Sequence, residues 1–403
     1  MREQAERIAQ RRQQALARPD VGLLRLAGEP CMRKLHSTIT RLKAMRGRLG
    51  FSEEVRDDRL ALFSSFGSNP GALQARTFVP KSLGAGAPLV VVLHGCTQTA
   101  VGYNRSSAWS DAADEHGFAL LFPEQQRANN PNLCFNWFLP EDARRGQGEA
   151  LSIRQMVAAM HERYGTDAKR AFVTGLSAGG AMAAVMLATY PEIFAGGAII
   201  AGLPYGTARS VPQAFDRMRG HCRASPDHLA AIVRSASGHK GPWPTLSVWH
   251  GTSDATVDSS NAQALIDQWR GLHGLPRDPS RTDTANGYPH RVWENADGRG
   301  VIEEYVITGM GHGTPLSEGE GFGETPGPFM LDVGISSTRR IANFWGIDDV
   351  QPSKGKAPPP SEEPVTPQLS HRVLQAKPPN RQGTSVGVQK TIEDALRAAG
   401  LMS

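Results

Sequence analysis

The stretch Arg170-Ala-Phe-Val-Thr-Gly-Leu-Ser-Ala-Gly-Gly-Ala-Met182 decides the fold expected for this chain of 403 residues. A short apolar, β-branched run leads to a serine flanked by glycines, and small residues then predict a helix from Ala178 to about Tyr190. A G-x-S-x-G sequence between strand and helix forms a strained turn, in which glycine avoids the clash of a Cβ atom. The pattern therefore predicts Ser177 at the carboxyl edge of a strand, beside the positive end of a helix dipole.

Strand and helix patterns alternate along the chain on both sides of this serine. Pro88–Leu93 is a continuous apolar, β-branched run of the kind found in strands buried on both faces. This alternation predicts an α/β fold with a mostly parallel sheet, right-handed crossovers and helices on both faces. In chain order, the predicted elements are antiparallel strands at 59–64 and 74–79, a strand at 88–93, a helix at 104–116, a strand at 118–122, a helix at 149–164, the strand before Ser177 and its helix, a strand at 197–201, a helical cap at 207–240, a strand at 245–249, a helix at 261–272, a loop rich in Gly, Pro and Asp, a last strand at 301–307 and a closing helix at 337–345.

The chain also supplies the two partners that a nucleophilic serine needs. A serine hydroxyl is a weak nucleophile at neutral pH, so a base must take its proton and a carboxylate must orient that base. Asp254 lies just beyond the predicted strand at 245–249, and His312 lies just beyond the one at 301–307. The order Ser177, Asp254, His312 is the order of an α/β-hydrolase triad, because loops at the carboxyl ends of parallel strands converge.

Other residues compete for these roles. Asp258 is an alternative acid, although its position before Ser259-Ser260-Asn261 suits a helix N-cap. Asp254 is itself open to interpretation as a turn residue. His250 either lines the site or is a satisfied core histidine, and we favour the core. His273 and His290 are less well placed than His312, which lies between glycines.

Further residues are candidates for oxyanion and substrate contacts. The run at 88–93 ends in His94-Gly-Cys96, where an α/β hydrolase places the loop that supplies an oxyanion donor. We therefore expect the backbone N–H groups of Cys96 and Ala178 to serve as the donors, and His94 to be structural. Trp137, Phe138 and Tyr205 either form an apolar platform for substrate or belong to the core. Cys96 and Cys134 are either bridged or reduced.

The composition is that of an ordinary globular protein, with 39% hydrophobic and 21% charged residues. No apolar run approaches the length of a membrane span, so no transmembrane segment is expected. The net charge of +5 is uneven, because residues 1–50 hold twelve Lys/Arg and four Asp/Glu, a net of +8, and the remainder sums to −3. Such an arm fits contact with nucleic acid, an acidic surface or a membrane. A helix is the simpler interpretation, and no nucleic-acid partner is expected.

The sequence predicts four regions. Residues 1–58 form the basic helical arm, 59–348 the α/β-hydrolase catalytic domain and 349–389 a Pro-rich linker, with eight prolines within 351–380. Residues 390–403 include a T-x-x-D capping box and predict a short amphipathic helix that docks on its own domain, another subunit or a partner. The first residues are charged and lead into no apolar segment, so no standard secretory signal is expected. The four cysteines have no zinc-like spacing.

Several stretches together resemble the poly(3-hydroxybutyrate) depolymerase family of esterases over about residues 60–346. The family's usual tryptophan after its second cysteine is Phe135 here, while Trp137 keeps the later aromatic. The stretches that carry the resemblance are Val92-Leu-His-Gly-Cys-Thr-Gln98, Cys134-Phe-Asn-Trp-Phe138, Gly175-Leu-Ser-Ala-Gly-Gly-Ala-Met182, Ala201-Gly-Leu-Pro-Tyr-Gly206, His250-Gly-Thr-Ser-Asp254 and Gly309-Met-Gly-His-Gly313.

The resemblance implies a serine esterase that cuts polyhydroxyalkanoate or hydroxybutyrate oligomers, feruloyl esters or acetyl esters, without a metal or organic cofactor. It implies that Ser177, Asp254 and His312 form the triad, and it favours a Cys96–Cys134 disulfide. Family members are commonly secreted, so it suggests an extracellular protein, with the cytoplasm as the alternative because no signal was found. A lipase or peptidase of the same fold, or a module that binds polymer granules, remains an alternative function.

Overall fold

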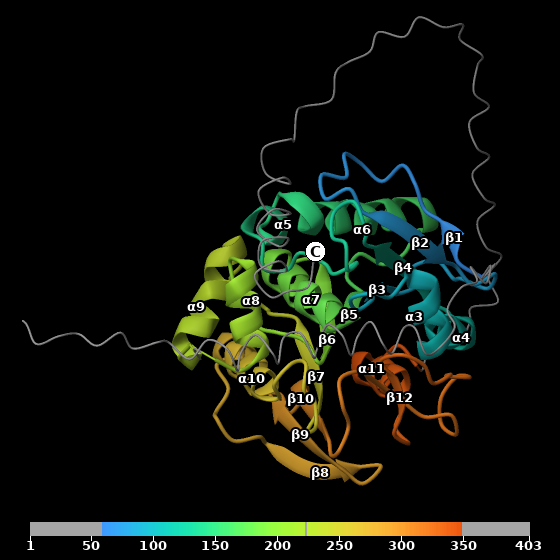
Figure 1. Cartoon of the computed structure of the whole chain (residues 1–403). Coiled ribbons are helices and arrows are strands. Elements are labelled where there is room, and N and C mark those ends of the chain that lie inside the picture. Colours follow the sequence, from blue (N-terminus) through green and yellow to red (C-terminus); the bar gives the residue numbers. More distant parts are fainter. Residues whose placement is uncertain (1–58, 222–223, 349–403) are drawn as a thin grey trace, which may run out of the picture. The chain divides into compact units, whose positions relative to one another are not determined.

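The computed structural model describes residues 59–221 and 224–348, and its centre is one ten-stranded sheet (Figure 1). The strands are β1 (Ala61–Leu62), β2 (Gln74–Phe78), β3 (Leu89–Leu93), β4 (Ala119–Glu124), β5 (Ala171–Leu176), β6 (Phe194–Ile200), β7 (Thr245–Gly251), β8 (Arg281–Ala285), β9 (Tyr288–Glu294) and β10 (Gly300–Ile307). Their order is β1-β2-β4-β3-β5-β6-β7-β10-β9-β8. The six strands from β4 to β10 in this order run parallel, and two antiparallel strands lie at each edge. The mostly parallel sheet is therefore confirmed.

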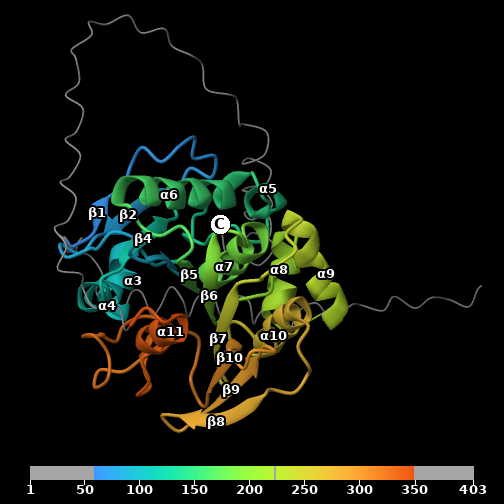
Figure 2. The same ribbon diagram turned by 180° about the vertical axis from the view of Figure 1, so that it is seen from behind.

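Helices cover both faces of this sheet, as Figures 1 and 2 show from opposite sides. They are α3 (Ala100–Ser107), α4 (Trp109–His116), α5 (Pro140–Ala143), α6 (Gly148–Tyr164), α7 (Ala178–Thr189), α8 (Val211–Met218), α9 (Pro226–Ser237), α10 (Ser260–His273) and α11 (Ser337–Trp345). The buried strand β3 shows why two layers are needed. Leu89, Val91 and Leu93 pack into the core that holds α6, α7 and α10, whereas Val90 and Val92 pack into the core with α3, α4 and α11. The predicted α/β architecture with helices on both faces is confirmed.

The helix predicted at 104–116 is instead two helices. Ala108 has a left-handed backbone, with φ of 53°, and its N–H donates to the carbonyl of Asn104 to close α3. The side chain of Asn104 then receives the N–H of Ser110 at the start of α4, so one polar residue joins both helix ends. The residue that ends a helix in this left-handed conformation is usually glycine, which can be recognised in a sequence. Here it is an alanine, so no glycine marked the break and the prediction was wrong.

The region after α10 holds more strands than predicted. The expected loop contains β8 and β9, joined by Asn286 and Gly287 with φ of 51° and 83°. Asn-Gly is the preferred sequence of a two-residue hairpin turn, because both residues accept positive φ. β10 is not the last strand either, because β11 (Thr314–Leu316) and β12 (Met330–Asp332) form a separate two-stranded parallel sheet.

The remaining predictions divide between described and undescribed residues. The predicted cap at 207–240 contains α8 and α9, and α9 packs against α7 and α10. The basic arm, the Pro-rich linker and the terminal helix lie outside the described residues. Within residues 59–221 and 224–348, no helix is both long and apolar enough to cross a membrane.

Candidate active site

The turn between β5 and α7 holds Ser177 in a strained conformation. Its φ of 57° and ψ of −117° lie in a region that L-residues rarely adopt, and its N–H donates to the carbonyl of Ile200 at the end of β6 at 2.9 Å. A Cβ atom at Gly179 would collide with the carbonyl oxygens of Leu93 and His94. The glycine therefore lets the start of α7 lie directly against the end of β3. Ser177 is 8% exposed.

Two backbone hydrogen bonds join the loop after β7, which carries Asp254, to the loop after β10, which carries His312. The two strands are parallel neighbours, and the N–H groups of Thr252 and Ser253 donate to the carbonyls of Ile307 and Met310 at 3.0 Å each. Asp254 directly follows Ser253 in the first loop, and His312 comes two residues after Met310 in the second. Nδ1 of His312 lies 2.7 Å from Oδ2 of Asp254. The structure therefore brings together two residues that lie 58 positions apart.

The carboxylate of Asp254 is buried and has hydrogen-bonding partners on both oxygens. Oδ1 accepts the N–H groups of Thr256 and Val257 at 2.8 and 2.9 Å. Oδ2 contacts His312 and also lies 3.4 Å from Nε2 of His250. Burial raises the pKa of Asp254, but hydrogen bonds from the two histidines and their charge outweigh it, so the pKa lies well below its ordinary value. Asp254 is therefore ionised at neutral pH.

The competing residues have other partners. His250 is buried, as favoured from the sequence, and its Nε2 lies 2.9 Å from the carbonyl of Val257, but it also contacts Asp254. The carboxylate of Asp258 accepts the N–H of Ser260 at 2.9 Å; the N-cap itself is Ser259, so the expected cap is wrong by one residue.

The two remaining histidines lie away from Asp254. Nε2 of His273 contacts the carbonyl of Pro244 at 3.0 Å. His290 lies between Asp283 and Glu303, at 2.8 and 3.1 Å.

The loop after β3 leaves one amide group free. The side chain of Gln98 accepts the N–H of Gly95 at 2.8 Å, and the N–H of Thr97 donates to the carbonyl of Asn132 at 2.7 Å. Between them, the N–H of Cys96 makes no hydrogen bond to any described residue, and the same holds for the N–H of Ala178. Two unpaired donors thus lie in the two segments that Gly179 brings into contact.

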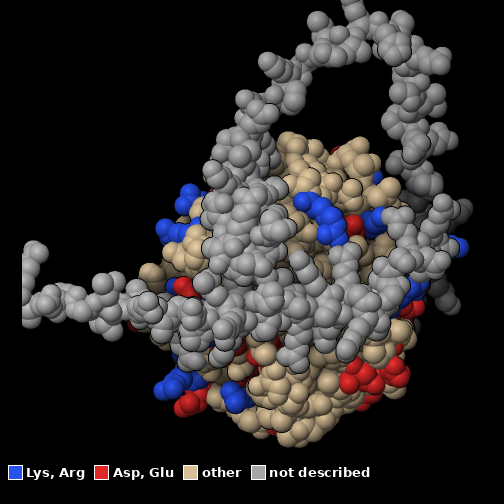
Figure 3. All heavy atoms as spheres, in the orientation of Figure 1, with Lys and Arg blue, Asp and Glu red and all other residues tan. Residues whose placement is uncertain are grey.

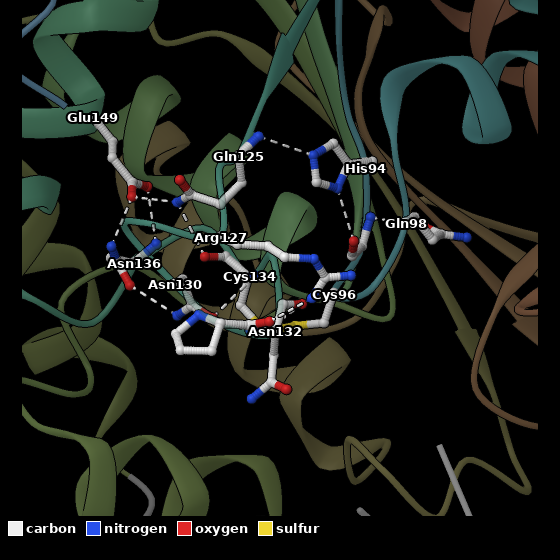
Figure 4. Close-up of a disulfide and its surroundings, with 12 residues drawn as sticks. His94, Cys96, Gln98, Gln125, Arg127, Asn130, Asn132, Cys134, Asn136 and Glu149 are labelled. Carbon is white, nitrogen blue, oxygen red and sulfur yellow. Dashed lines mark hydrogen bonds between the residues drawn. A yellow bond between two sulfur atoms is a disulfide. The ribbon is translucent and has the colours of Figure 1, made fainter. Parts of the chain in front are cut away.

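Buried polar groups hold this loop in place (Figure 4). Nε2 of His94 accepts the N–H of Gln125 at 3.1 Å, so Nδ1 carries the proton and donates to the carbonyl of Gly95 at 2.8 Å. Burial lowers the pKa of His94, which favours this neutral form. Glu149 is fully buried and accepts hydrogen bonds from Gln125 and from both nitrogens of Asn136, at 2.6 to 2.8 Å. Nothing in the sequence pattern marked Glu149 as part of the site, because the residue lay only in a predicted amphipathic helix.

Cys96 and Cys134 form a disulfide, in agreement with the expectation from the family resemblance (Figure 4). The bridge joins the loop after β3 to the segment after β4, and the hydrogen bond between Thr97 and Asn132 lies beside it. The aromatic residues that follow are therefore anchored to the loop that carries the free N–H of Cys96.

Trp137, Phe138 and Tyr205 line one pocket of 330 Å³. Trp137 is buried and packs edge-on against Phe138, with ring centroids 5.5 Å apart, and Tyr205 is half-buried. The three residues therefore line one space, and they also belong to the core or pack against it. Ser177 is not among the residues that line it.

Comparisons with known proteins point to one family. Residues 75–284 match the family model described as "Esterase PHB depolymerase". The chain is 47% identical over 291 residues to "Poly(3-hydroxyalkanoate) depolymerase C" of Paucimonas lemoignei, covering 72% of this chain and 70% of that protein. It is 32% identical to "Feruloyl esterase B" of Talaromyces stipitatus, covering 64% and 72%. A solved acetyl xylan esterase from Aspergillus awamori superposes with a TM-score of 0.61 at 27% identity, covering 72% of this chain and 99% of that one.

Proposed function

Because this chain belongs to the esterase PHB depolymerase family and is a carboxylic ester hydrolase, we propose that it cleaves esters through a covalent acyl-enzyme on Ser177. In this mechanism His312 takes the proton of Ser177 as the hydroxyl attacks the ester carbonyl, and then gives it to the departing alcohol. Water, activated by the same histidine, releases the acid. Asp254 orients His312 and stabilises its cationic form.

The observation that carries this proposal is the 2.7 Å contact between Nδ1 of His312 and the ionised carboxylate of Asp254. That contact leaves Nε2 of His312 as the nitrogen available to a serine. The loops of both residues follow the carboxyl ends of parallel strands. These ends lie at the same end of the sheet as the carboxyl end of β5, which directly precedes Ser177.

The N–H groups of Cys96 and Ala178 are the proposed oxyanion donors. Each is free of any partner among the described residues, and Ala178 is the first residue of α7, where the helix dipole favours negative charge. Donors fixed before the reaction stabilise the charge that develops on the carbonyl oxygen without a cost of reorganisation. The disulfide and His94 fix the loop that presents Cys96.

The proposed substrates are hydroxyalkanoate esters, polymeric or oligomeric, with feruloyl and acetyl esters as alternatives. The 47% identity to a protein named as a poly(3-hydroxyalkanoate) depolymerase favours the first class. The pocket beside Trp137 and Tyr205 offers apolar and aromatic surface for such a chain. No cofactor takes part in this mechanism.

The proposal is tested with Ser177→Ala and with Ser64→Ala as a control at an exposed serine. On p-nitrophenyl butyrate and hydroxybutyrate oligomers, we expect Ser177→Ala to lose roughly a thousandfold or more in kcat, because the triad acts as a unit. The control should keep wild-type turnover. A Ser177→Ala variant that stays folded and still turns over these esters at nearly the wild-type rate would contradict the mechanism. Hydrolysis of a peptide or a long-chain triglyceride in preference to all of them would favour the peptidase or lipase alternative.

A further inference from the structure

The pocket lined by Trp137, Phe138 and Tyr205 is also strongly basic. Its wall includes Arg144, Arg145 and Arg209, and none of its fourteen lining residues is acidic. The three arginines come from the segments beside α5 and before α8, and Figure 3 shows Lys and Arg side chains gathered at the edge of the molecule beside α9. We call this space the arginine pocket.

The guanidinium groups of two of the three arginines have no partner within residues 59–221 and 224–348. Arg145 pairs with Glu192 at 2.6 Å and stacks on the ring of Tyr190. The guanidinium groups of Arg144 and Arg209 make no ion pair or hydrogen bond to the described part of the chain. Two exposed cations that line one pocket without a counterion favour a negatively charged ligand.

Tyr205 lines the same pocket as Arg144 and Arg209. Burial raises the pKa of Tyr205, and the charges of the two arginines act in the opposite direction without outweighing burial, so the phenol stays protonated at neutral pH. The two guanidinium groups offer only donors to a ligand oxygen, and the protonated phenol can donate as well. A carboxylate accepts from such donors, whereas a neutral ester end accepts more weakly.

The segments that line the pocket follow strands on both sides of β5, the strand that leads to Ser177. The aromatic walls of the pocket follow β4 and β6, and β5, which ends before Ser177, lies between these strands in the sheet. Arg145 also donates to the carbonyl of Thr189, the last residue of α7, and a helix of twelve residues is roughly 18 Å long. Arg145 therefore ties one wall of the pocket to the end of α7 opposite Ser177, and a ligand that reaches from Ser177 to this wall is longer than a small ester.

We propose that the arginine pocket binds the free carboxylate end of a linear hydroxyacid oligomer, an inference that rests on the proposed esterase function. In such an oligomer the carboxylate end lies on the alcohol side of every internal ester. The fragment held by Arg144 and Arg209 is therefore the one that departs when Ser177 is acylated. The enzyme then cuts at a fixed distance from the carboxylate end and releases fragments of uniform length.

The test compares two 3-hydroxybutyrate oligomers of equal length, one with a free carboxylate and one capped as a methyl ester. Wild-type protein should show about a fivefold higher kcat/KM for the free acid, mainly through a lower KM, since a partly exposed charge pair contributes on this scale. The preference should shrink in high salt, which screens exposed charges. Products of the free acid should include one dominant fragment length.

The double variant Arg144→Gln/Arg209→Gln should lose this preference, and Arg105→Gln, an exposed arginine on α3, should keep it. p-Nitrophenyl acetate, which carries no carboxylate, should be turned over equally by all of them, so a folding defect would be detected. Equal kcat/KM for the two oligomers in wild-type protein, or a preference that survives in the double variant, would overturn the inference. Failure of wild-type protein to hydrolyse even p-nitrophenyl acetate would instead overturn the proposed function.

Discussion

Removing the Cys96–Cys134 disulfide is predicted to weaken both the fold and the site. The bridge closes a loop of 38 positions, and loop-closure entropy for that length predicts a loss of about 4 kcal/mol in the free energy of unfolding. The hydrogen bond from Thr97 to Asn132 remains, so the loop after β3 should keep its fold but gain mobility. Because that loop presents the N–H of Cys96, we expect kcat to fall about tenfold, less than for the loss of a whole oxyanion donor.

The assay uses a background in which Cys31 and Cys222 are replaced by serine, so that only the bridging pair responds to reductant. Urea unfolding and turnover of p-nitrophenyl butyrate are measured for the oxidised protein, the reduced protein and Cys96→Ser/Cys134→Ser. Reduced protein and double variant should agree with each other and differ from the oxidised form. A change in unfolding free energy below about 1 kcal/mol, or unchanged kcat after complete reduction, would refute the reasoning.

Three other substitutions test separate parts of the account. Gly179→Ala places a Cβ against the carbonyls of Leu93 and His94, so kcat should fall about a hundredfold because the turn that holds Ser177 is displaced. The control Gly319→Ala, where a Cβ meets nothing within 4 Å, should leave kcat unchanged. Equal kcat of the two variants would show that the turn at Ser177 tolerates a Cβ at position 179. Burial raises the pKa of Glu324 to about 7 from an ordinary 4.5, so its contribution to stability is present below pH 4.5 and is lost as pH rises through 7. Measured by urea, the free energy of unfolding of wild type should fall by up to about 3 kcal/mol across this pH range because of Glu324, and Glu324→Gln should not show this part of the fall. The same pH slope in both proteins would contradict the prediction. His250→Phe removes the second histidine from Asp254 and should lower kcat about tenfold at constant KM. His250→Gln should restore part of the loss. Equal kcat in wild type and His250→Phe would show that His250 only fills space.

The parts of the fold that follow local rules could be predicted from the sequence. The turn at Ser177 is marked in the sequence by its flanking glycines, and the buried run at Leu89–Leu93 has no polar residue to place on a surface. The positions of Asp254 and His312 after two strands followed from the same logic, because parallel strands end at one edge. Their hydrogen bond is a consequence of that topology.

Other features depend on partners that a linear pattern does not reveal. Glu149 occupies the first turn of α6, where an acid usually faces water. Its burial depends on hydrogen bonds from the side chain of Gln125 and from both nitrogens of Asn136. The strand β8 is polar and mostly exposed, so it lacks the hydrophobic alternation that signals a strand, although Asn286-Gly287 marked its hairpin. The arginine pocket likewise forms only when segments from α5 and from beyond β6 meet.

The most direct test of the central claim is to identify the nucleophile chemically. The protein is treated with a p-nitrophenyl alkylphosphonate, release of nitrophenol is counted, and the tryptic peptide Ala171–Arg209 is fragmented by mass spectrometry, since it also contains threonines and tyrosines. We expect one phosphonyl group per chain, located on Ser177, and no labelling of Ser177→Ala. Labelling of a different residue, or full esterase activity in protein that stays unlabelled, would contradict it.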